Sequence, residues 1–551
     1  MNLHDLFAIP LRRSPDRPAL RFAAPDGTRT DLTYAELFAE SRRLAAGLHT
    51  RGVRRGDRVA FFLGNRPEFV TAYLAVVRLG AVMVPLNLAY RRREIVHILE
   101  DAGPRLLLAE RSQLAVLDEL EPAERAVEVI LAEDLGSLSC EAGEGWGGGS
   151  VDSDDLAMIL YTSGTTGRSK GAMITHGNVL ATVTGLLAAW AWEPADVLLL
   201  TLPLFHTHGL VVGLHCALAA GATVLLRRKF DAAQVVRELL ARELLGGQPT
   251  LFFGVPTMYV RLVEELRRPL TPDPSPIAHP SPGRGEPPPS RLAASPLSRP
   301  GGSAMGEGGP GGEGLRRLRL FCSGSAPLSP ETFAAFRELT GQDILERYGM
   351  TETGMSLSNP YAGPRLPGTV GTPLPGVSAR IVDGIDVEPG GRDVPPGGEG
   401  ELLVRGSHVF PGYWNDPEKT AASFLHDELG RRWFRTGDLA RRDPATGSYT
   451  LLGRRHELIL RGGFNIYPRE IEEVLASFPG VREAAVVGRP HPEWGEVPVA
   501  FLVVDSPVDE AVLASWCRDQ MASFKIPQEI RYLDALPRNA LGKVQKHLLR
   551  E

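Results

Sequence analysis

Cysteine is scarce in this chain, and the few cysteines lie far apart. The four are Cys140, Cys216, Cys322 and Cys517, among 551 residues. Their spacing matches no structural zinc or iron–sulfur pattern, and so scattered a set does not indicate a disulfide framework. We therefore interpret them as reduced, mostly buried thiols, and we expect a cytoplasmic protein.

The chain also lacks long apolar runs and any large excess of one charge. No stretch of about 18 apolar residues occurs, so no membrane insertion is expected. The N-terminal residues lack the apolar core of a secretory signal peptide. The formal net charge of −6 gives no reason to expect nucleic acid or an anionic membrane as a partner. We expect a monomer or homodimer that acts on small molecules.

What is present favours two domains of different character. Across the first two thirds, strand-like apolar runs such as 59–63, 106–109 and 223–226 alternate with helix-like runs such as 69–78, 207–219 and 232–245. This alternation is typical of an α/β domain with parallel sheets and packed helices. Beyond Asp438 the elements become short, which indicates a small α+β domain. We place the large domain at 1–454 and the small one at 455–551.

One segment interrupts the alternation. Residues 269–314 consist largely of Pro, Gly and Ser, with few large apolar side chains. Such a segment buries too little surface to offset its ordering entropy, so we predict a disordered insertion.

The stretch 161–178, YTSGTTGRSKGAMITHGN, has the composition of a phosphate-binding loop. It follows a short apolar run that indicates a strand and precedes an apolar run from Val179 that indicates a helix. Its glycines let backbone N–H groups turn toward an anion, its hydroxyls donate hydrogen bonds, and Lys170 adds a charge. The spacing differs from a Walker A loop, because Lys170 follows Ser169 and precedes Gly171.

Five further motifs follow in order along the chain: SGSAPL at 323–328, ERYGMTE at 346–352, RTGD at 435–438 with Gly453 and Arg454, GGFNIYP at 462–468, and PRNALGK at 537–543. Tyr348 offers a ring face for adenine, Thr351 a hydroxyl for a phosphate, and Glu352 a hard oxygen for Mg²⁺. On the residues alone, a solvated loop carboxylate is the favoured interpretation of Glu352.

In this order the six motifs resemble the adenylate-forming superfamily of acyl-CoA synthetases, carrier-protein adenylation domains and luciferases. The resemblance runs from Leu32 to Leu549, apart from the insertion. It implies a large N-terminal domain, a small mobile C-terminal domain, and activation of a carboxylic acid through an acyl-adenylate with ATP, Mg²⁺ and coenzyme A. Lys543 would be the adenylation lysine and Glu352 the magnesium ligand. Position 456 would be the interdomain hinge, where His456 replaces the usual Asp or Lys.

The resemblance also assigns the remaining ligands. The predicted nucleotide and coenzyme A contacts are Thr162, Ser163, Gly164, Thr165, Thr166, Gly167, Lys170, Ser323, Gly324, Ser325, Ala326, Tyr348, Gly349, Asp438, Arg454, Gly462 and Gly463. Thr351 and His206 complete the catalytic set.

Three segments are similar to malonyl-CoA synthetases: PLFHTHG at 203–209, FGVPTMYVR at 253–261 and SNPY at 358–361. This similarity implies that Arg261 and Ser325 bind a distal carboxylate, with His206 and Thr207 lining the acid site. Helical periodicity favours the opposite interpretation. Arg261 falls outside the apolar face of its predicted helix, which would place it among solvated charges.

We therefore expect an ATP-dependent ligase for malonate, with methylmalonate as the alternative acid. A fatty-acyl or aryl-CoA ligase would share every core motif, and a catalytically degenerate nucleotide-binding scaffold is a remote alternative.

Overall fold

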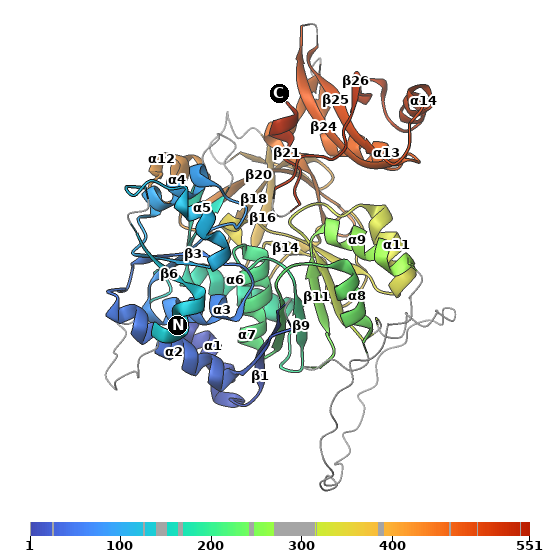
Figure 1. The fold of residues 1–551 in the computed structure, drawn as a ribbon. Helices are drawn as coiled ribbons and strands as arrows, with labels where there is room; N and C mark the ends of the chain where they lie inside the picture. The colour runs from blue at the N-terminus through green and yellow to red at the C-terminus, as the bar shows by residue number, and fades with distance from the viewer. Residues whose placement is uncertain are drawn as a thin grey trace, which may run out of the picture.

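The structure is a computed structural model that describes residues 2–24, 27–124, 127–138, 151–162, 169–241, 247–268, 315, 317–383, 391–461, 464–492, 494–539 and 542–550. A large N-terminal part carries three β-sheets, and a smaller C-terminal part carries a fourth (Figure 1). The predicted insertion at 269–314 lies outside the described residues.

The first sheet has six strands in the order β6-β5-β3-β4-β7-β8, parallel except for the last pair. They are β3 (Arg58–Phe62), β4 (Val82–Pro85), β5 (Leu106–Ala109), β6 (Glu128–Leu131), β7 (Leu156–Thr162) and β8 (Lys170–Thr175). Val59 and Phe61 of β3 join a core with α2 (Tyr34–Thr50) and α3 (Pro67–Leu79), whereas Ala60 and Phe62 join one with α4 (Arg92–Ala102). Because both faces are covered, these strands read as continuous apolar runs.

The second sheet has nine strands in the order β15-β14-β13-β12-β11-β9-β10-β1-β2, parallel in its middle and antiparallel at both edges. They are β1 (Pro18–Ala23), β2 (Arg29–Thr33), β9 (Val197–Leu200), β10 (Thr223–Arg227), β11 (Leu251–Gly254), β12 (Leu320–Ser323), β13 (Ile344–Tyr348), β14 (Leu357–Ser358) and β15 (Thr372–Pro373). The predicted α/β alternation is confirmed.

Helices cover both faces of this second sheet. One face carries α1 (Leu3–Arg13), α6 (His176–Ala189), η3 (His208–His215) and α7 (Cys216–Ala220). The other carries α8 (Ala232–Leu240), α9 (Pro256–Arg267) and α11 (Pro330–Thr340). The helix predicted at 207–219 begins as the π-helix η3, where a Cβ on Gly209 would lie 2.3 Å from the Pro203 carbonyl oxygen. Such π turns recur at functional sites.

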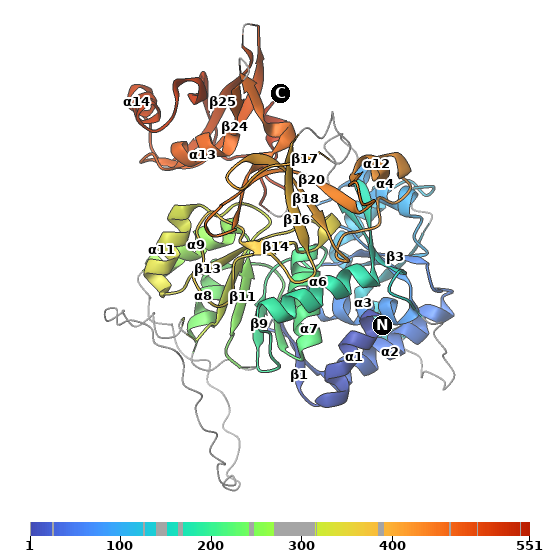
Figure 2. The ribbon, with the colours of Figure 1, turned by 180° about the vertical axis from the view of Figure 1, so that it is seen from behind.

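A third sheet, fully antiparallel, was not predicted. Its order is β17-β16-β18-β20-β19, with β21 also paired to β20. The strands are β16 (Ser378–Asp383), β17 (Arg392–Asp393), β18 (Glu399–Arg405), β19 (Phe424–His426), β20 (Arg432–Arg442) and β21 (Tyr449–Arg454). Seen from behind, β16, β18 and β20 lie between the first two sheets and the C-terminal part (Figure 2).

The short elements of the N-terminal part are η1 (Arg111–Gln113), α5 (Leu114–Asp118), η2 (Ala132–Leu138), η4 (Thr351–Thr353) and α12 (Pro417–Ala422). Those of the C-terminal part are η5 (Arg455–Glu457), η6 (Ser523–Lys525) and η7 (Lys546–Leu549).

The C-terminal part is the predicted α+β unit. Its strands are β22 (Ile459–Arg461), β23 (Phe464–Ile466), β24 (Val481–His491), β25 (Gly495–Val504) and β26 (Glu529–Tyr532). Val486 and Leu502 face α13 (Pro468–Ala476) and α14 (Glu510–Gln520), whereas Val487 and Phe501 face the C-terminal tail. The division at 454/455 stays a prediction. It falls where β21 of one sheet gives way to β22 of another.

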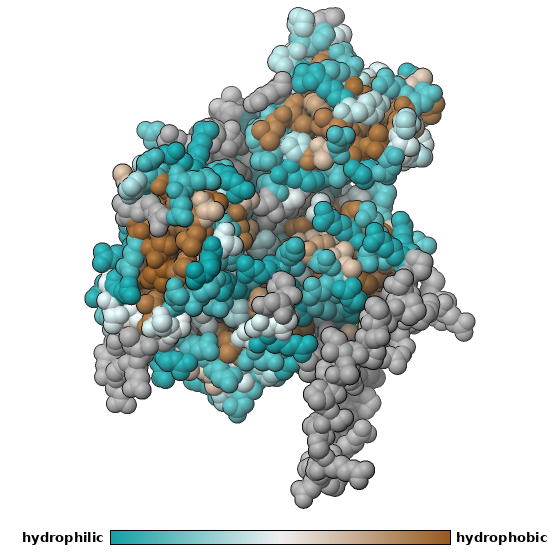
Figure 3. Space-filling view, in the orientation of Figure 1, coloured by the Kyte–Doolittle hydropathy of each residue, from teal (hydrophilic) through white to brown (hydrophobic). Residues whose placement is uncertain are grey.

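Polar contacts join the C-terminal part to the body. Arg469 Nη1 donates to the Leu451 carbonyl at 2.6 Å, and Arg455 Nη1 donates to Glu401 Oε2 at 2.9 Å. In the space-filling view, apolar residues gather on the visible face of the C-terminal part as well as on the body (Figure 3). Within the described residues, no helix is long and apolar enough to cross a bilayer.

Candidate active site

The predicted phosphate-binding stretch is flanked by two antiparallel strands that pair with each other. Thr162 at the end of β7 pairs with Lys170 at the start of β8, so the two ends of the loop lie opposite each other. Strand β8 was not predicted, because the sequence suggested a helix soon after the loop. His97 Nε2 of α4 lies 2.8 Å from the Ser169 carbonyl oxygen and fixes the loop exit. Ser163, Gly164, Thr165, Thr166 and Gly167 lie outside the described residues.

The predicted adenine and ribose residues lie together. Asp438 and Arg454 pair directly across β20 and β21, and Asp438 Oδ1 lies 2.7 Å from Arg454 Nε. The Tyr348 hydroxyl donates to Asp438 Oδ2 at 2.5 Å. Next to it, a Cβ on Gly349 would lie 2.1 Å from the Gly354 carbonyl oxygen, so the turn there requires glycine. The structure thus gathers an aromatic ring, a carboxylate and a guanidinium at one place.

Glu352 lies beside this group, next to the half-buried Thr351, in the turn that follows β13. Its side chain is only 6% exposed, and burial raises the pKa of its carboxyl. Among the described residues its carboxylate forms no ion pair within 4 Å, and it accepts a hydrogen bond from Tyr413 at 2.9 Å. A buried carboxylate with neutral partners fits a hard divalent cation such as Mg²⁺.

The residues predicted to line the acid site surround η3 and the turn after β12. Ser325 Oγ lies 3.3 Å from His208 Nδ1, and the His208 amide donates to His206 Nδ1 at 3.2 Å. Burial, with Arg347 next, lowers the pKa of His206 to about 4, so this imidazole is neutral at pH 7. Ser325 has a φ of +71°, a strained value for a non-glycine residue and typical of a functional turn.

Arg347, which the sequence analysis left without a role, lies in the middle of this site. It is 3% exposed, and its Nε and Nη2 have no hydrogen-bond partner among the described residues. Burial lowers the pKa of this guanidinium. Other buried polar atoms near it also lack partners: Ser323 Oγ, Thr207 Oγ1 and His208 Nε2. Unpaired buried polar groups are costly, so their concentration here points to a polar ligand.

A sequence signal for Arg347 did exist. All five residues of β13 are buried, yet two of them, Glu346 and Arg347, are of the acidic and basic types that carry charge at pH 7. Charged residues are rarely buried in a central strand without a purpose. The signal was masked because the same motif contains Tyr348, Thr351 and Glu352, which already had roles.

Gly324 is required by the close approach of Arg347. A Cβ at position 324 would lie 2.4 Å from Arg347 Nη1 and 2.5 Å from Cζ. We expect Gly324→Ala to lower the free energy of unfolding by about 1–3 kcal/mol, as overpacking does. Denaturant unfolding measures this. Gly136→Ala is the matched control, because a Cβ there meets nothing within 4 Å. Equal stabilities of the two variants would contradict the packing described.

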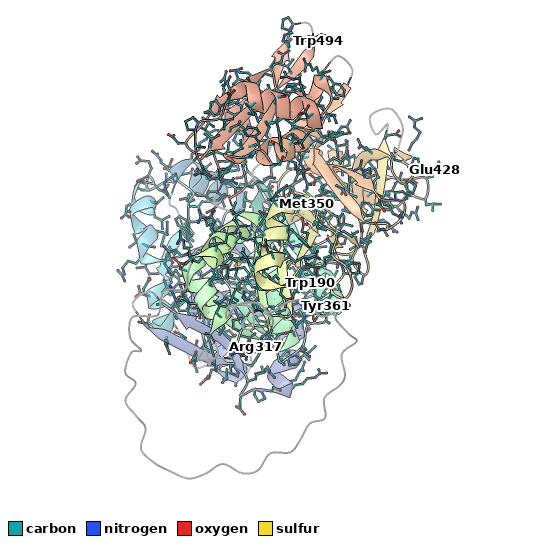
Figure 4. The ribbon with its side chains drawn as sticks, turned by 90° about the vertical axis from the view of Figure 1, so that its right-hand side faces the viewer. Trp190, Arg317, Met350, Tyr361, Glu428 and Trp494 are labelled. Carbon is teal, nitrogen blue, oxygen red and sulfur yellow. The ribbon has the colours of Figure 1, made fainter. Side chains whose placement is uncertain are left out.

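Lys543 lies on the C-terminal tail, near enough to Arg454 and Asp438 for their charges to act on its ammonium. Its side chain is exposed to solvent, but the neighbouring protein partly desolvates the ammonium. This desolvation and the charge of Arg454 lower the pKa of Lys543, whereas Asp438 and Glu457 raise it. The preceding Gly542 packs on α9, where a Cβ would lie 2.9 Å from Thr257 Oγ1. Met350, labelled in Figure 4, lies beneath the C-terminal part, so the ERYGMTE motif lies at the junction of the two parts.

The roles of the other predicted residues stay predictions. His456 is exposed and lies 3.9 Å from Glu457, and its hinge role stays a prediction. Arg261 is exposed on α9, as its helical position indicates, one turn beyond Thr257. Its role as a carboxylate anchor stays a prediction. Ala326 is half-buried beside Ser325. Gly462 and Gly463 lie outside the described residues.

Comparison with known proteins agrees with this geometry. The AMP-binding enzyme family model matches residues 7–414, and the AMP-binding enzyme C-terminal domain matches 470–543. The chain belongs to the AMP-binding enzyme family. As such it is an acid–thiol ligase, whose ligands are ATP, Mg²⁺, coenzyme A and a carboxylic acid.

Individual relatives of this AMP-binding enzyme differ in their acids. The mitochondrial malonate–CoA ligase ACSF3 of Mus musculus is 35% identical, covering 93% of this chain and 85% of the relative. A feruloyl-CoA synthase of Amycolatopsis is 33% identical, covering 99% and 98%. The crystal structure of ATP-bound MatB from Rhodopseudomonas palustris is 37% identical, with a TM-score of 0.82 and coverage of 100% and 98%.

Proposed function

We propose that this AMP-binding enzyme activates malonate, or methylmalonate, and transfers it to coenzyme A. The observation that carries the proposal is the buried guanidinium of Arg347, whose Nε and Nη2 lack partners although it lies near Ser325, His206 and His208. A planar guanidinium matches a carboxylate in a bidentate pair, and such a pair would satisfy the charge that burial leaves unpaired.

The reaction has two steps. A carboxylate oxygen of the acid attacks the α-phosphorus of ATP, and pyrophosphate leaves. The thiolate of coenzyme A then attacks the carbonyl of the adenylate, AMP leaves, and the thioester forms. Asp438 and Tyr348 hold the nucleoside, and Lys543 supplies positive charge where negative charge develops in the first step. Mg²⁺ held by Glu352 would neutralise charge on the phosphoryl oxygens.

The neutral histidines support the acid site. Because burial holds the pKa of His206 near 4, its ring adds no positive charge between pH 5 and 8. The distal carboxylate of a dicarboxylic acid would therefore pair with an arginine. Arg347 is the buried candidate, and Arg261 on α9 is the exposed one.

A second candidate substrate is an aryl acid. A cavity of about 250 Å³ lies between α6, Met355, the 374–377 turn and His408. A smaller gap lined by Thr182 and His408 reaches Thr207 and Thr351 of the site. This space is large enough to accommodate part of a larger acyl group.

The proposal is tested by CoA-dependent release of AMP with malonate, methylmalonate, acetate, hexanoate and coumarate. We expect malonate or methylmalonate to give the highest kcat/KM. If coumarate or hexanoate exceeds both dicarboxylates, the proposal is wrong and the aryl or fatty-acyl alternative replaces it.

A further inference from the structure

The carboxylate of Glu352 is held by one neighbour that none of the motifs above includes, Tyr413. The Tyr413 hydroxyl donates to Glu352 Oε1 at 2.9 Å, and both side chains are buried, at 8% and 6% exposure. The backbone of Glu352 is held from the same segment, because the Phe410 amide donates to its carbonyl at 2.8 Å. Residues 410–413 therefore fix both ends of Glu352.

The backbone of Tyr413 is tied to the strand that leaves the phosphate loop. Tyr413 forms a β-bridge with Ala172, two residues after Lys170. On either side of this bridge, the Trp414 amide donates to the Gly171 carbonyl at 2.7 Å, and the Met173 amide donates to the Gly412 carbonyl at 3.0 Å. One residue thus connects the exit of the phosphate loop to the carboxylate assigned to the metal.

The position of the Tyr413 ring does not depend on its hydroxyl. The Tyr413 amide donates to Thr420 Oγ1 at 2.9 Å, and a Cβ on Gly412 would lie 2.4 Å from Thr420 Cγ2. The ring packs edge-on against Phe410, with centroids 4.9 Å apart, and Phe410 in turn contacts Phe424 and Phe434. Removing the hydroxyl alone should leave the backbone and ring in place.

We propose that Tyr413 is a positioning residue for the metal carboxylate: its hydroxyl holds Glu352 in the orientation that receives Mg²⁺, at a distance from the phosphate loop set by the bridge to Ala172. The inference rests on the assignment of Glu352 to the metal. A neutral donor suits this task, since it orients the carboxylate without neutralising the charge that attracts the cation. Partners of this kind typically contribute about 10- to 100-fold to metal affinity.

The test is Tyr413→Phe, which deletes one oxygen. Mn²⁺ binding to the enzyme with an α,β-methylene analogue of ATP, measured by electron paramagnetic resonance, is expected to weaken about 10- to 100-fold. In turnover, the Mg²⁺ concentration for half-maximal rate should rise, while kcat at saturating Mg²⁺ stays near that of the wild type. A loss at every Mg²⁺ concentration, with unchanged Mn²⁺ affinity, would overturn the proposal, because it would mean a structural role.

Two further variants make the result specific. Tyr449→Phe is the matched control. Tyr449 is also buried, but its hydroxyl donates to the Ala379 carbonyl at 3.3 Å within the third sheet and not to Glu352. It should leave Mn²⁺ affinity unchanged. Glu352→Gln should abolish Mn²⁺ binding. If Glu352→Gln binds Mn²⁺ like the wild type, the metal assignment fails and this inference fails with it, whichever acid the enzyme prefers.

Discussion

Lys543→Ala is expected to slow formation of the acyl-adenylate by about 100- to 1,000-fold or more, as loss of a transition-state donor does. Thioester formation from supplied malonyl-adenylate and coenzyme A should stay within a few-fold of the wild type. The reason is placement. In this structure the lysine lies near Arg454 and Asp438, with Gly542 packed on α9, and we expect this orientation to serve attack on ATP.

Pyrophosphate release measures the first half-reaction, and consumption of the coenzyme A thiol measures the second. Lys525→Ala is a suitable control, because this lysine of the same domain pairs with Glu470 at 2.5 Å and faces no nucleotide residue described here. Equal losses in both half-reactions of Lys543→Ala would contradict the assignment.

The second large effect concerns Arg347. Arg347→Leu is expected to lower kcat/KM for malonate about 30- to 4,000-fold, since removing one partner of a buried charge pair costs about 2–5 kcal/mol. The kcat/KM for butyrate, a short acid whose distal end is uncharged, should stay equal or improve. The substitution removes an unpaired buried charge that an apolar substrate would otherwise leave unsatisfied.

Arg261→Leu separates the two candidate anchors. The same crossed pattern is expected there, but smaller, because Arg261 is exposed before the substrate binds. A folding defect would instead depress malonate and butyrate together, and thermal unfolding of each variant detects it. If kcat/KM falls equally for malonate and butyrate in both variants, neither arginine recognises the distal carboxylate.

Much of the fold followed from periodicity. Strand β5 is a run of four buried apolar residues, and most residues of α3 are apolar, so both were predicted close to their observed bounds. The helix prediction, 69–78, missed the proline that begins α3. The antiparallel sheet around β20 was not predicted. Only its last strand, β21, was predicted, at 449–452, and it was assigned to the small domain. The other strands are separated by irregular turns, so neither a period of two nor a long apolar run identified them.

The site divides in the same way. Asp438 and Arg454 are 16 positions apart in sequence, yet the motif order predicted that both serve the nucleotide, and β-pairing places them opposite each other. Arg347 and Tyr413 were not found. The charge of Arg347 inside a strand was a signal, but the motif that contains it already had assigned residues. The contact of Tyr413 with Glu352 arises from tertiary packing and leaves no periodic trace in the sequence.

The central claim is that a buried guanidinium recognises the distal carboxylate of the acid. The most direct test compares kcat/KM of the wild-type enzyme for malonate and for monomethyl malonate, which keeps the reacting carboxylate but lacks the distal charge. We predict a preference for malonate of about 30-fold or more, as loss of a buried charge pair implies. Equal use of the two acids, or a preference for the monoester, would contradict the account.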